Sequence, residues 1–433
     1  MKYRYRSDEE MKDSGVEWIG KIPKGVEQER LKYDVKFEKG SNPKNLNINY
    51  EGLPYVGASD FGNKNYKIFT TDTNLPICDR EDLLILWDGA RAGIVDYGHE
   101  GVVSSTIVKV KNLSENIYSK YFNWYMKSFE KYFIDMSNGT TIPHMNRKFI
   151  ENLHIIKFPI DYQKKITNFL DEKTSDFDNI ISKKEKLIEK LEEAKKSLIS
   201  EGVTGKVKVV KNGDDFEIVK REDSEMKDSG VEWIGKIPKD WEVKRIKYLF
   251  DIKKNIAGEL GYDVLSVTQS GIKIKDITKN GGQLSMDYSK YQIVEIDDFI
   301  MNHMDLLTGF VDCSKFKGVT SPDYRVFRLK GYNNCKEYYN YILQLCYYNR
   351  IFYSLARGVS GMGRWRLQTE TFKNFIVPMP KIEEQERIAK FILKKTNDID
   401  ILKNKLKINI EKLKEAKQAL ISEAVTGKIE ILD

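Results

Sequence analysis

The chain has 433 residues, of which 40% are hydrophobic, so it is too long for one core and should fold into roughly two to four domains. No apolar run reaches the roughly 20 residues of a membrane helix, and the first residues lack the apolar segment of a signal peptide, which argues against a membrane-spanning or secreted protein. The 72 basic and 65 acidic residues give a net charge of +7, which favours a polyanionic partner but excludes a histone-like protein. We therefore expect a cytoplasmic protein.

A short box opens the chain, and Met11–Lys24 recurs unchanged as Met226–Lys239, 215 residues later (226 − 11). Its glycine and lysine spacing is that of a phosphate-binding loop. However, Ile22 stands where a serine or threonine would ligate magnesium, and Trp18 crowds a loop that needs small residues. We therefore reject a nucleotide site and expect Trp18 and Trp233 to anchor each box to the segment that follows.

A globule follows each box, at roughly residues 25–157 and 240–378. Each contains, in the same order, an apolar strand after an acidic residue and then an aromatic helix: Asp82–Trp87 and Tyr118–Phe133 in the first, Asp298–Met301 and Glu337–Leu355 in the second. The rings recur at helical spacing, which predicts core positions rather than platforms for stacking bases. The two globules otherwise share little sequence, as two diverged readers on one duplicated frame would.

After the first globule, residues 163–206 are predicted to form one long amphipathic helix. Its apolar positions are spaced as in the seam of a coiled coil, interrupted by Lys173 and Lys184: Ile166, Leu170, Phe177, Ile180, Leu187, Leu191, Ala194 and Leu198. The series recurs 222 residues later (388 − 166), interrupted by Lys395 and Asn409: Ile388, Ile392, Ile399, Leu402, Leu406, Leu413, Ala416 and Leu420. Since each seam would otherwise face water, the two helices should pack against each other.

The link between the repeats, residues 207–225, is predicted to form a small hairpin that turns at Asn212-Gly213. About forty helical residues make a rod of roughly 60 Å, and so short a linker does not easily return along it. We therefore predict an α+β protein in which two mixed α/β globules lie at opposite ends of an antiparallel two-helix coiled coil, related by an approximate twofold axis. The predicted divisions are 1–157, 158–206, 207–225, 226–378 and 379–433.

No catalytic motif is convincing. The sequence has no glycine-rich fingerprint after a strand, no histidine pair at zinc spacing and no Asn-Pro-Pro-aromatic sequence, and the glycine-rich run Gly358–Gly363 follows a helix. The four cysteines lack metal-type spacing, so we expect reduced, mostly buried thiols and neither a metal nor a cofactor in this chain. A binding module is favoured over an enzyme.

Polar loops in both globules suit DNA, because arginine can grip guanine edges, asparagine and glutamine adenine edges, and threonine a thymine methyl or a phosphate. For any single one of these residues, a solvated loop side chain is an equally good interpretation. The candidate DNA-binding residues are Lys64, Arg91, Thr140, Thr141, His144, Asn146, Arg147, Thr268, Gln269, Asn302, His303, Arg357, Arg364 and Arg366.

Three pairs of segments carry a resemblance to a known family: the box ends Trp18–Pro23 and Trp233–Pro238, the helix starts Gln163–Ile166 and Glu384–Ile388, and the Val-Thr-Gly-Lys endings at 203–206 and 425–428. In this doubled arrangement the whole chain resembles the specificity subunits of Type I restriction-modification systems. Two departures separate the halves, since Val26 stands opposite Trp241 and Asp161-Tyr162 opposite Glu383-Glu384.

This resemblance implies that each globule is a target recognition domain that reads one half of a split DNA site. The paired helices would act as a ruler and as the docking surface for two copies of an adenine methyltransferase subunit, and a motor-nuclease subunit would join for restriction. S-adenosylmethionine, ATP and magnesium would belong to those partners. The residues implied in partner binding are Gln163, Lys173, Lys184, Gln385, Lys395 and Asn409. Two alternatives stay open: a coiled-coil scaffold whose globules bind protein or carbohydrate, and the recognition module of a Type II-like fused enzyme.

Overall fold

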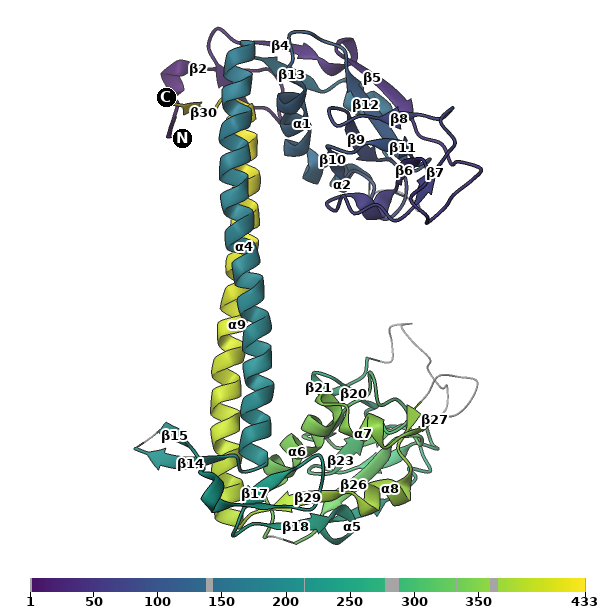
Figure 1. The fold of residues 1–433 in the computed structure, drawn as a ribbon, viewed down its shortest axis with the longest axis vertical. Coiled ribbons are helices and arrows are strands. Elements are labelled where there is room, and N and C mark those ends of the chain that lie inside the picture. Colours follow the sequence, from purple (N-terminus) through teal and green to yellow (C-terminus); the bar gives the residue numbers. More distant parts are fainter. Residues whose placement is uncertain are drawn as a thin grey trace. The chain divides into compact units, whose positions relative to one another are not determined.

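The computed structural model describes residues 2–137, 143–213, 215–276, 288–331, 333–358 and 365–432. They divide into two compact units: Met1–Glu185 with Lys407–Asp433, and Lys186–Leu406. Each unit contains one globule and part of both long helices, α4 (Ile160–Val203) and α9 (Ile382–Val425) (Figure 1). The first unit is therefore assembled from both ends of the chain.

The first unit is built around the sheet β5-β12-β9-β10, which is antiparallel throughout, and a second sheet β7-β6-β11-β8, in which β6 and β11 are parallel. Its strands are β1 (Tyr3–Tyr5), β2 (Met11–Asp13), β3 (Lys21–Pro23), β4 (Glu27–Arg30), β5 (Val35–Lys39), β6 (Leu53–Val56), β7 (Phe69–Thr70), β8 (Ile77–Cys78), β9 (Leu83–Leu86), β10 (Val95–Tyr97), β11 (Gly101–Val103), β12 (Ile107–Asn112), β13 (His154–Lys157) and β30 (Ile429–Ile431). Its short helices are α1 (Ser119–Ser128), α2 (Glu130–Ser137) and α3 (Arg147–Glu151).

The second unit repeats the central sheet as β19-β26-β23-β24. Its strands are β14 (Val207–Asn212), β15 (Asp215–Lys220), β16 (Met226–Asp228), β17 (Lys236–Pro238), β18 (Glu242–Arg245), β19 (Phe250–Lys253), β20 (Leu265–Thr268), β21 (Gly271–Ile274), β22 (Gln292–Val294), β23 (Phe299–Met301), β24 (Val311–Cys313), β25 (Gly318–Thr320), β26 (Arg325–Leu329), β27 (Arg357–Gly358), β28 (Trp365–Arg366) and β29 (Ile376–Met379). Its short helices are α5 (Ile246–Leu249), α6 (Lys336–Tyr348), α7 (Ile351–Ser354) and α8 (Thr369–Asn374).

Strands β9 and β23 are apolar at every position, and all of their side chains are buried. In β9, Leu83 and Ile85 belong to the main core of the first unit, whereas Leu84 and Leu86 belong to a second cluster on the other face. A strand buried on both faces reads as a continuous apolar run rather than an alternating one. This explains why the run after Asp82 could be recognised in the sequence.

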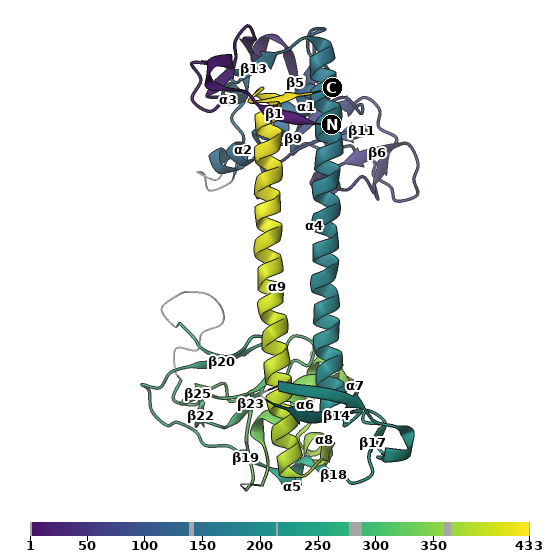
Figure 2. The same cartoon turned by 90° about the vertical axis from the view of Figure 1, so that its left-hand side faces the viewer.

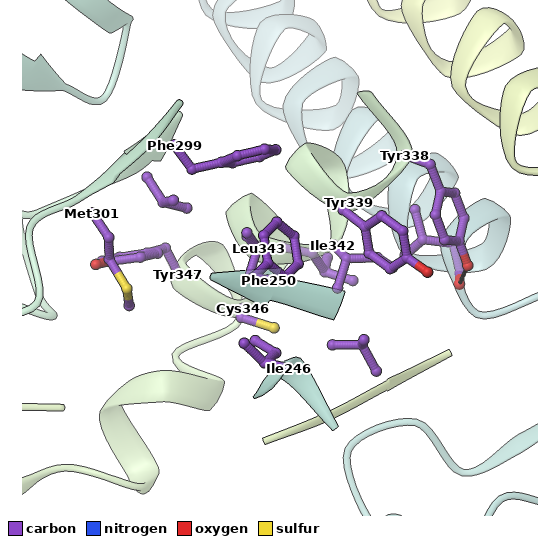
Figure 3. Close-up of a cluster of buried hydrophobic side chains, with 14 of the residues drawn as sticks. Ile246, Phe250, Phe299, Met301, Tyr338, Tyr339, Ile342, Leu343, Cys346 and Tyr347 are labelled. Atoms are coloured by element: carbon purple, nitrogen blue, oxygen red, sulfur yellow. Dashed lines mark hydrogen bonds between the residues drawn. The ribbon is translucent and has the colours of Figure 1, made fainter. Parts of the chain in front are cut away.

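The aromatic helices supply core side chains, as predicted: Tyr121 and Tyr125 of α1 and Tyr338 and Tyr339 of α6 are fully buried. Figure 3 shows the two tyrosines of α6 in the core of the second unit, near Phe250. The prediction of one continuous helix in each globule was wrong, because each is two helices. In the second unit the break lies at Arg350, whose left-handed φ of +56° cannot continue a helix.

The long helices run antiparallel wherever they meet within a unit. In the second unit Lys403 pairs with Glu192, and Lys195 pairs with Asp400 at 2.7 Å, so residue numbers rise along α4 as they fall along α9. The predicted antiparallel packing is confirmed. The predicted seam was wrong at Ile180, Leu187 and Leu402, which are more than 40% exposed. Ile181 and Ile410, which lie outside that seam, are buried, whereas Leu406 is buried as predicted. A straight helix drifts by about 20° per heptad from a 3.5-residue repeat, so the buried face moves to neighbouring residues.

The Val-Thr-Gly-Lys endings are helix caps that dock on a box. Gly205 and Gly427 have φ values of +71° and +73°, and the following lysine N–H donates to the carbonyl five residues back in each helix. A Cβ on Gly427 would lie 2.7 Å from Pro23 Cγ, and one on Gly205 would lie 2.5 Å from Pro238 Cδ. The repeated glycine is therefore required both by the backbone and by close approach to the proline of the box.

The linker hairpin and the two termini occupy equivalent places. Strands β14 and β15 pair across a turn at Gly213, which confirms the predicted hairpin. In the first unit β30 pairs with β1, and the register is the same as that of β14 with β15. Ile429 lies opposite Tyr5, where the second unit has Val207 opposite Lys220. Figure 2 shows β1 and β30 side by side, next to both ends of the chain. The two termini thus meet where the second unit has a continuous hairpin.

The two departures between the halves compensate each other. In the second unit Trp241 is buried and its Nε1 donates to Glu384 at 2.9 Å, while Arg221 pairs with the same carboxylate at 2.7 Å. In the first unit Val26 leaves no such donor, and Tyr162 replaces the glutamate, its hydroxyl accepting from Arg6 at 3.2 Å. Losing the indole donor and losing the carboxylate therefore go together.

The described cysteines are all free thiols, and three of the four are buried, as expected. Within the described ranges, no helix combines the length and apolar character needed to cross a membrane, and no group of three or more His, Cys, Asp or Glu is arranged to hold a metal ion.

Candidate nucleic-acid interface

In the first unit, the polar loop around His144 is hydrogen-bonded to Trp87 and Asp88, which follow strand β9. The N–H of Met145 donates to the carbonyl of Trp87 at 3.0 Å, and the backbones of His144 and Asp88 form an isolated antiparallel β-bridge. The Asn146 side chain then caps α3 by accepting from the N–H of Lys148 at 3.0 Å. This cap and these bonds bring three of the predicted residues, His144, Asn146 and Arg147, to the end of the sheet.

The side chain of His144 is held by the carboxylate of Asp88. Its Nδ1 lies 2.5 Å from Asp88 Oδ1, and Lys39 Nζ lies 3.0 Å from the other carboxylate oxygen. Burial alone would raise the pKa of Asp88, but the hydrogen bonds from His144 and Lys39 outweigh it and hold that pKa below its usual value. The ionised carboxylate fixes the orientation of the imidazole, which meets the Trp87 ring edge-on at 6.2 Å.

These side chains line a pocket of about 580 Å³ whose walls are largely apolar. Phe37, Trp87 and Phe149 contribute rings, and Lys39 and Arg147 are basic residues of the lining. The Arg147 guanidinium lies 5.2 Å from the centre of the Phe37 ring and its Nε donates to Glu151 at 2.7 Å. Basic side chains beside exposed hydrogen-bonding groups suit contact with nucleic acid.

The second unit has a corresponding loop beside β23. Leu367 N–H donates to the carbonyl of His303 at 3.0 Å, and Arg357 pairs with Arg366 across β27 and β28. Arg366 is exposed, whereas His303 is only 7% exposed. Two predicted residues, His303 and Arg366, therefore meet at the end of the central sheet.

Behind this loop lies Arg325, a buried arginine that the sequence analysis did not single out. Its Nη2 donates to the carbonyl of Leu367 at 3.1 Å and to Thr369 Oγ1 at 3.2 Å, and its guanidinium lies 4.6 Å from the centre of the Phe372 ring. Burial and the charge of Arg366 lower the pKa of Arg325 to about 10, so it stays protonated at neutral pH. Burial, Arg325 and Arg366 lower the pKa of His303 to about 3, so that imidazole is neutral.

Three predicted side chains are occupied within their own loops. Arg91 donates to the carbonyl of Ala58 at 2.7 Å, the Asn302 side chain accepts from the N–H groups of Met304 and Asp305, and Thr268 Oγ1 donates to the carbonyl of Gly271 at 2.8 Å.

Figure 3 shows Tyr347 directed toward Met301 at the end of β23, where its hydroxyl donates to the carbonyl of Asn302 at 2.7 Å.

The other predicted DNA-binding residues are less closely placed. Lys64 and Gln269 are exposed on loops, and no contact brings either to the His144 or Arg366 groups in the described part of the chain. Thr140, Thr141 and Arg364 lie outside the described residues, and for Arg357 only the backbone is described.

Sequence reasoning missed Lys39, Asp88 and Arg325. Asp88 could have been found, because it follows β9, the strand equivalent to β23, after which Asn302 and His303 stand in the second unit. Lys39 and Arg325 lie within strands β5 and β26, where a single basic residue has no local signal, since its role depends on the neighbouring strands.

Of the residues implied in partner binding, Gln163 and Gln385 are buried at the starts of the long helices. The side-chain Oε1 of Gln163 accepts from the backbone N–H of Tyr118 at 2.7 Å. The side-chain Oε1 of Gln385 accepts from the backbone N–H of Cys335 at 2.9 Å. Both amides therefore fasten a long helix to its globule. The others lie along the helices: Asn409 is exposed, Lys173 and Lys184 are partly exposed, and Lys395 lies 3.6 Å from Asp215.

Comparison with known proteins also supports a nucleic-acid interface. Residues 23–193 and 238–412 match the family described as Type I restriction modification DNA specificity domain. The chain is 29% identical over 432 residues to the Type I restriction enzyme MjaVIII specificity subunit of Methanocaldococcus jannaschii, covering 95% of this chain and 94% of that one. It is 19% identical over 367 residues to the Type I restriction enzyme EcoBI specificity subunit of Escherichia coli, covering 81% and 74%. A solved structure from work on complex assembly and conformational transition of the type I R-M system shares the fold, with a TM-score of 0.65 at 13% identity, covering 94% of this chain and 99% of that one.

Proposed function

Since the chain belongs to the Type I restriction modification DNA specificity family, we propose that each unit reads one half of a bipartite DNA target and that the chain directs an adenine methyltransferase to that target. The chain recognises DNA sequence within a Type I restriction-modification system and is a non-catalytic recognition subunit. It works with DNA and with other subunits of such a system. The division into two half-sites and the identity of the bound subunits are the proposed parts.

One observation carries the division into half-sites. The two units share the central sheet, the box, the cap on the long helix and the buried glutamine, yet their polar loops differ in residue type at the end of the same sheet. A conserved frame with different side chains in one place is what two independent readers require, because base contacts set sequence preference while the frame sets position.

The long helices supply the proposed partner surface. Because α4 and α9 keep aliphatic residues such as Ile180, Leu187 and Leu402 exposed, they offer an apolar surface on which two methyltransferase subunits can dock, with Lys184 and Asn409 beside it. A motor-nuclease subunit would join for restriction. S-adenosylmethionine, ATP and magnesium are assigned to these partners, and the complex is placed in the cytoplasm with the DNA it modifies.

Exchange of one reader tests the proposal. Residues 40–155 are replaced by the corresponding segment of another family member, and the chimera is combined with the methyltransferase partner. Methylation-aware sequencing should then show a changed first half-site and an unchanged second one. The matched control is an exchange within the second globule, which should do the reverse.

A chimera that alters both half-sites together would refute two independent readers. The purified chain without its partner should transfer no methyl group, and methyl transfer by the single chain would overturn its assignment as a recognition subunit.

A further inference from the structure

The strand register shows which residues of the two units are equivalent. In the first unit Ile85 pairs with Val95 and Val108, and in the second Met301 pairs with Val311 and Arg325. Ile85 therefore corresponds to Met301, and Val108 corresponds to Arg325.

The polar loops follow the same correspondence. Trp87 and His303 each stand two residues beyond these strand positions, and each carbonyl accepts from the loop, from Met145 in the first unit and Leu367 in the second. His144 and Arg366, which precede those two donors, therefore occupy equivalent places.

The side chains at this shared place differ between the two units. In the first, the apolar Trp87 and Val108 line the pocket, and His144 is bonded to the carboxylate of Asp88. In the second, the equivalent residues are His303 and Arg325, and both bond to Leu367, the residue after Arg366. Neither arginine has a carboxylate partner among the residues that the structure describes.

A buried guanidinium without a carboxylate is costly, and here only neutral groups offset that cost. The acceptors of Arg325 are the Leu367 carbonyl, the Thr369 hydroxyl and, at 3.7 Å, the sulfur of Met301, and its guanidinium lies over the Phe372 ring. Its positive field is therefore uncompensated within this cluster. An exposed arginine in front of such a charge favours electronegative acceptors, which in DNA are the O6 and N7 atoms of guanine and the phosphate oxygens.

We propose that Arg366 contacts an electronegative acceptor in the second half-site, that Arg325 is a positioning residue whose buried charge strengthens that contact, and that His144, balanced by Asp88, takes the equivalent place in the first half-site. The two readers thus differ in charge at one shared position of the frame. This inference rests on the proposed half-site function and names the residues that would set it.

The test uses the full chain bound to its methyltransferase partner. Selection from a random DNA library first defines both half-sites for the unaltered complex, and absence of any sequence preference would mean failure of the proposed function itself. Affinities are then measured for Arg366→Ala, Arg366→Lys and the control Arg245→Ala, an exposed arginine on β18, over duplexes that differ at single positions.

If Arg366 contacts guanine, Arg366→Ala should lose about 5- to 150-fold of discrimination at one position of the second half-site. Arg366→Lys should lose most of it too, because lysine lacks the two-pronged geometry. If the acceptor is phosphate, Arg366→Ala should weaken all sequences alike and lower the salt slope by about one, while Arg366→Lys stays close to the unaltered chain. Affinity, preference and salt slope all equal to those of Arg245→Ala would overturn the proposal.

Arg325→Met separates charge from packing. The equivalent Val108 shows that the frame accepts an apolar residue there, so the variant should fold. It should lose several-fold in affinity for the second half-site, show a weaker salt dependence and leave the first half-site preference unchanged. A folded Arg325→Met variant with unaltered affinity and salt slope would show that this arginine is only structural, which refutes its part of the proposal.

Discussion

Replacing Gly427 by alanine tests how the end of α9 is held on the first unit. Gly427 has a φ of +73°, and an added Cβ would lie 2.6 Å from Phe158 Cζ and 2.7 Å from Pro23 Cγ. Gly15 of the same unit has a φ of +71°, and an added Cβ there meets no atom within 4 Å. Gly427→Ala and Gly15→Ala therefore share the free-energy cost of a left-handed backbone, and only Gly427→Ala adds a steric clash.

The expected magnitudes follow from these distances. A left-handed backbone costs an alanine about 1 to 2 kcal/mol, which applies to both variants. Forcing a methyl group into a packed contact adds about 1 to 3 kcal/mol, which applies only to Gly427→Ala. The free energy of unfolding should thus fall by about 1 to 2 kcal/mol in Gly15→Ala and by about 2 to 5 kcal/mol in Gly427→Ala.

Urea unfolding followed by circular dichroism measures both losses, provided that the unfolding slope stays the same in the two variants and the unaltered chain. Equal losses in Gly427→Ala and Gly15→Ala would refute the reasoning, because they would mean that the end of α9 is not held against Pro23 and Phe158.

Three further predictions concern the frame. Arg221→Ala leaves the carboxylate of Glu384 without its charge partner, with side chains only 8% and 14% exposed, and should cost about 3 to 5 kcal/mol in chemical unfolding. Arg6→Ala should cost less, because its carboxylate partner Glu430 is 31% exposed and keeps a pair with Arg4; equal losses would count against the pairing. Adding one heptad to both long helices lengthens them by roughly 10 Å, so a methylation screen over spacer lengths should favour about three more base pairs at reduced affinity; an unchanged spacer would end the ruler idea. A chain closed by a short turn between its termini and reopened at Gly213 should keep the original DNA preference in a library selection, since β1 with β30 matches β14 with β15, and failure to fold would contradict that equivalence.

The candidate interface shows how far local patterns reach. The loops around His144 and Arg366 could be predicted because polar and basic residues cluster in a short stretch of sequence. The sequence around Asp88 and Arg325 did not show what either side chain does, since their roles depend on contacts with residues more than forty positions away. Asn302 and Gln163 carry side chains that suit recognition, and only their hydrogen bonds show that both are used inside the protein.

The sequence by itself determined the duplicated frame, the two long helices, the linker hairpin and the apolar central strands, because repeats, helical spacing and turn residues act within a few residues of chain. The tertiary structure alone decided where the aromatic helices break, which face of α4 is buried, and that Trp241 requires Glu384 while Val26 tolerates Tyr162. It also decided that Arg325 bonds to Leu367, next to Arg366. These outcomes depend on packing between distant segments, and a local pattern specifies which residues are apolar or polar but not which partner each one meets.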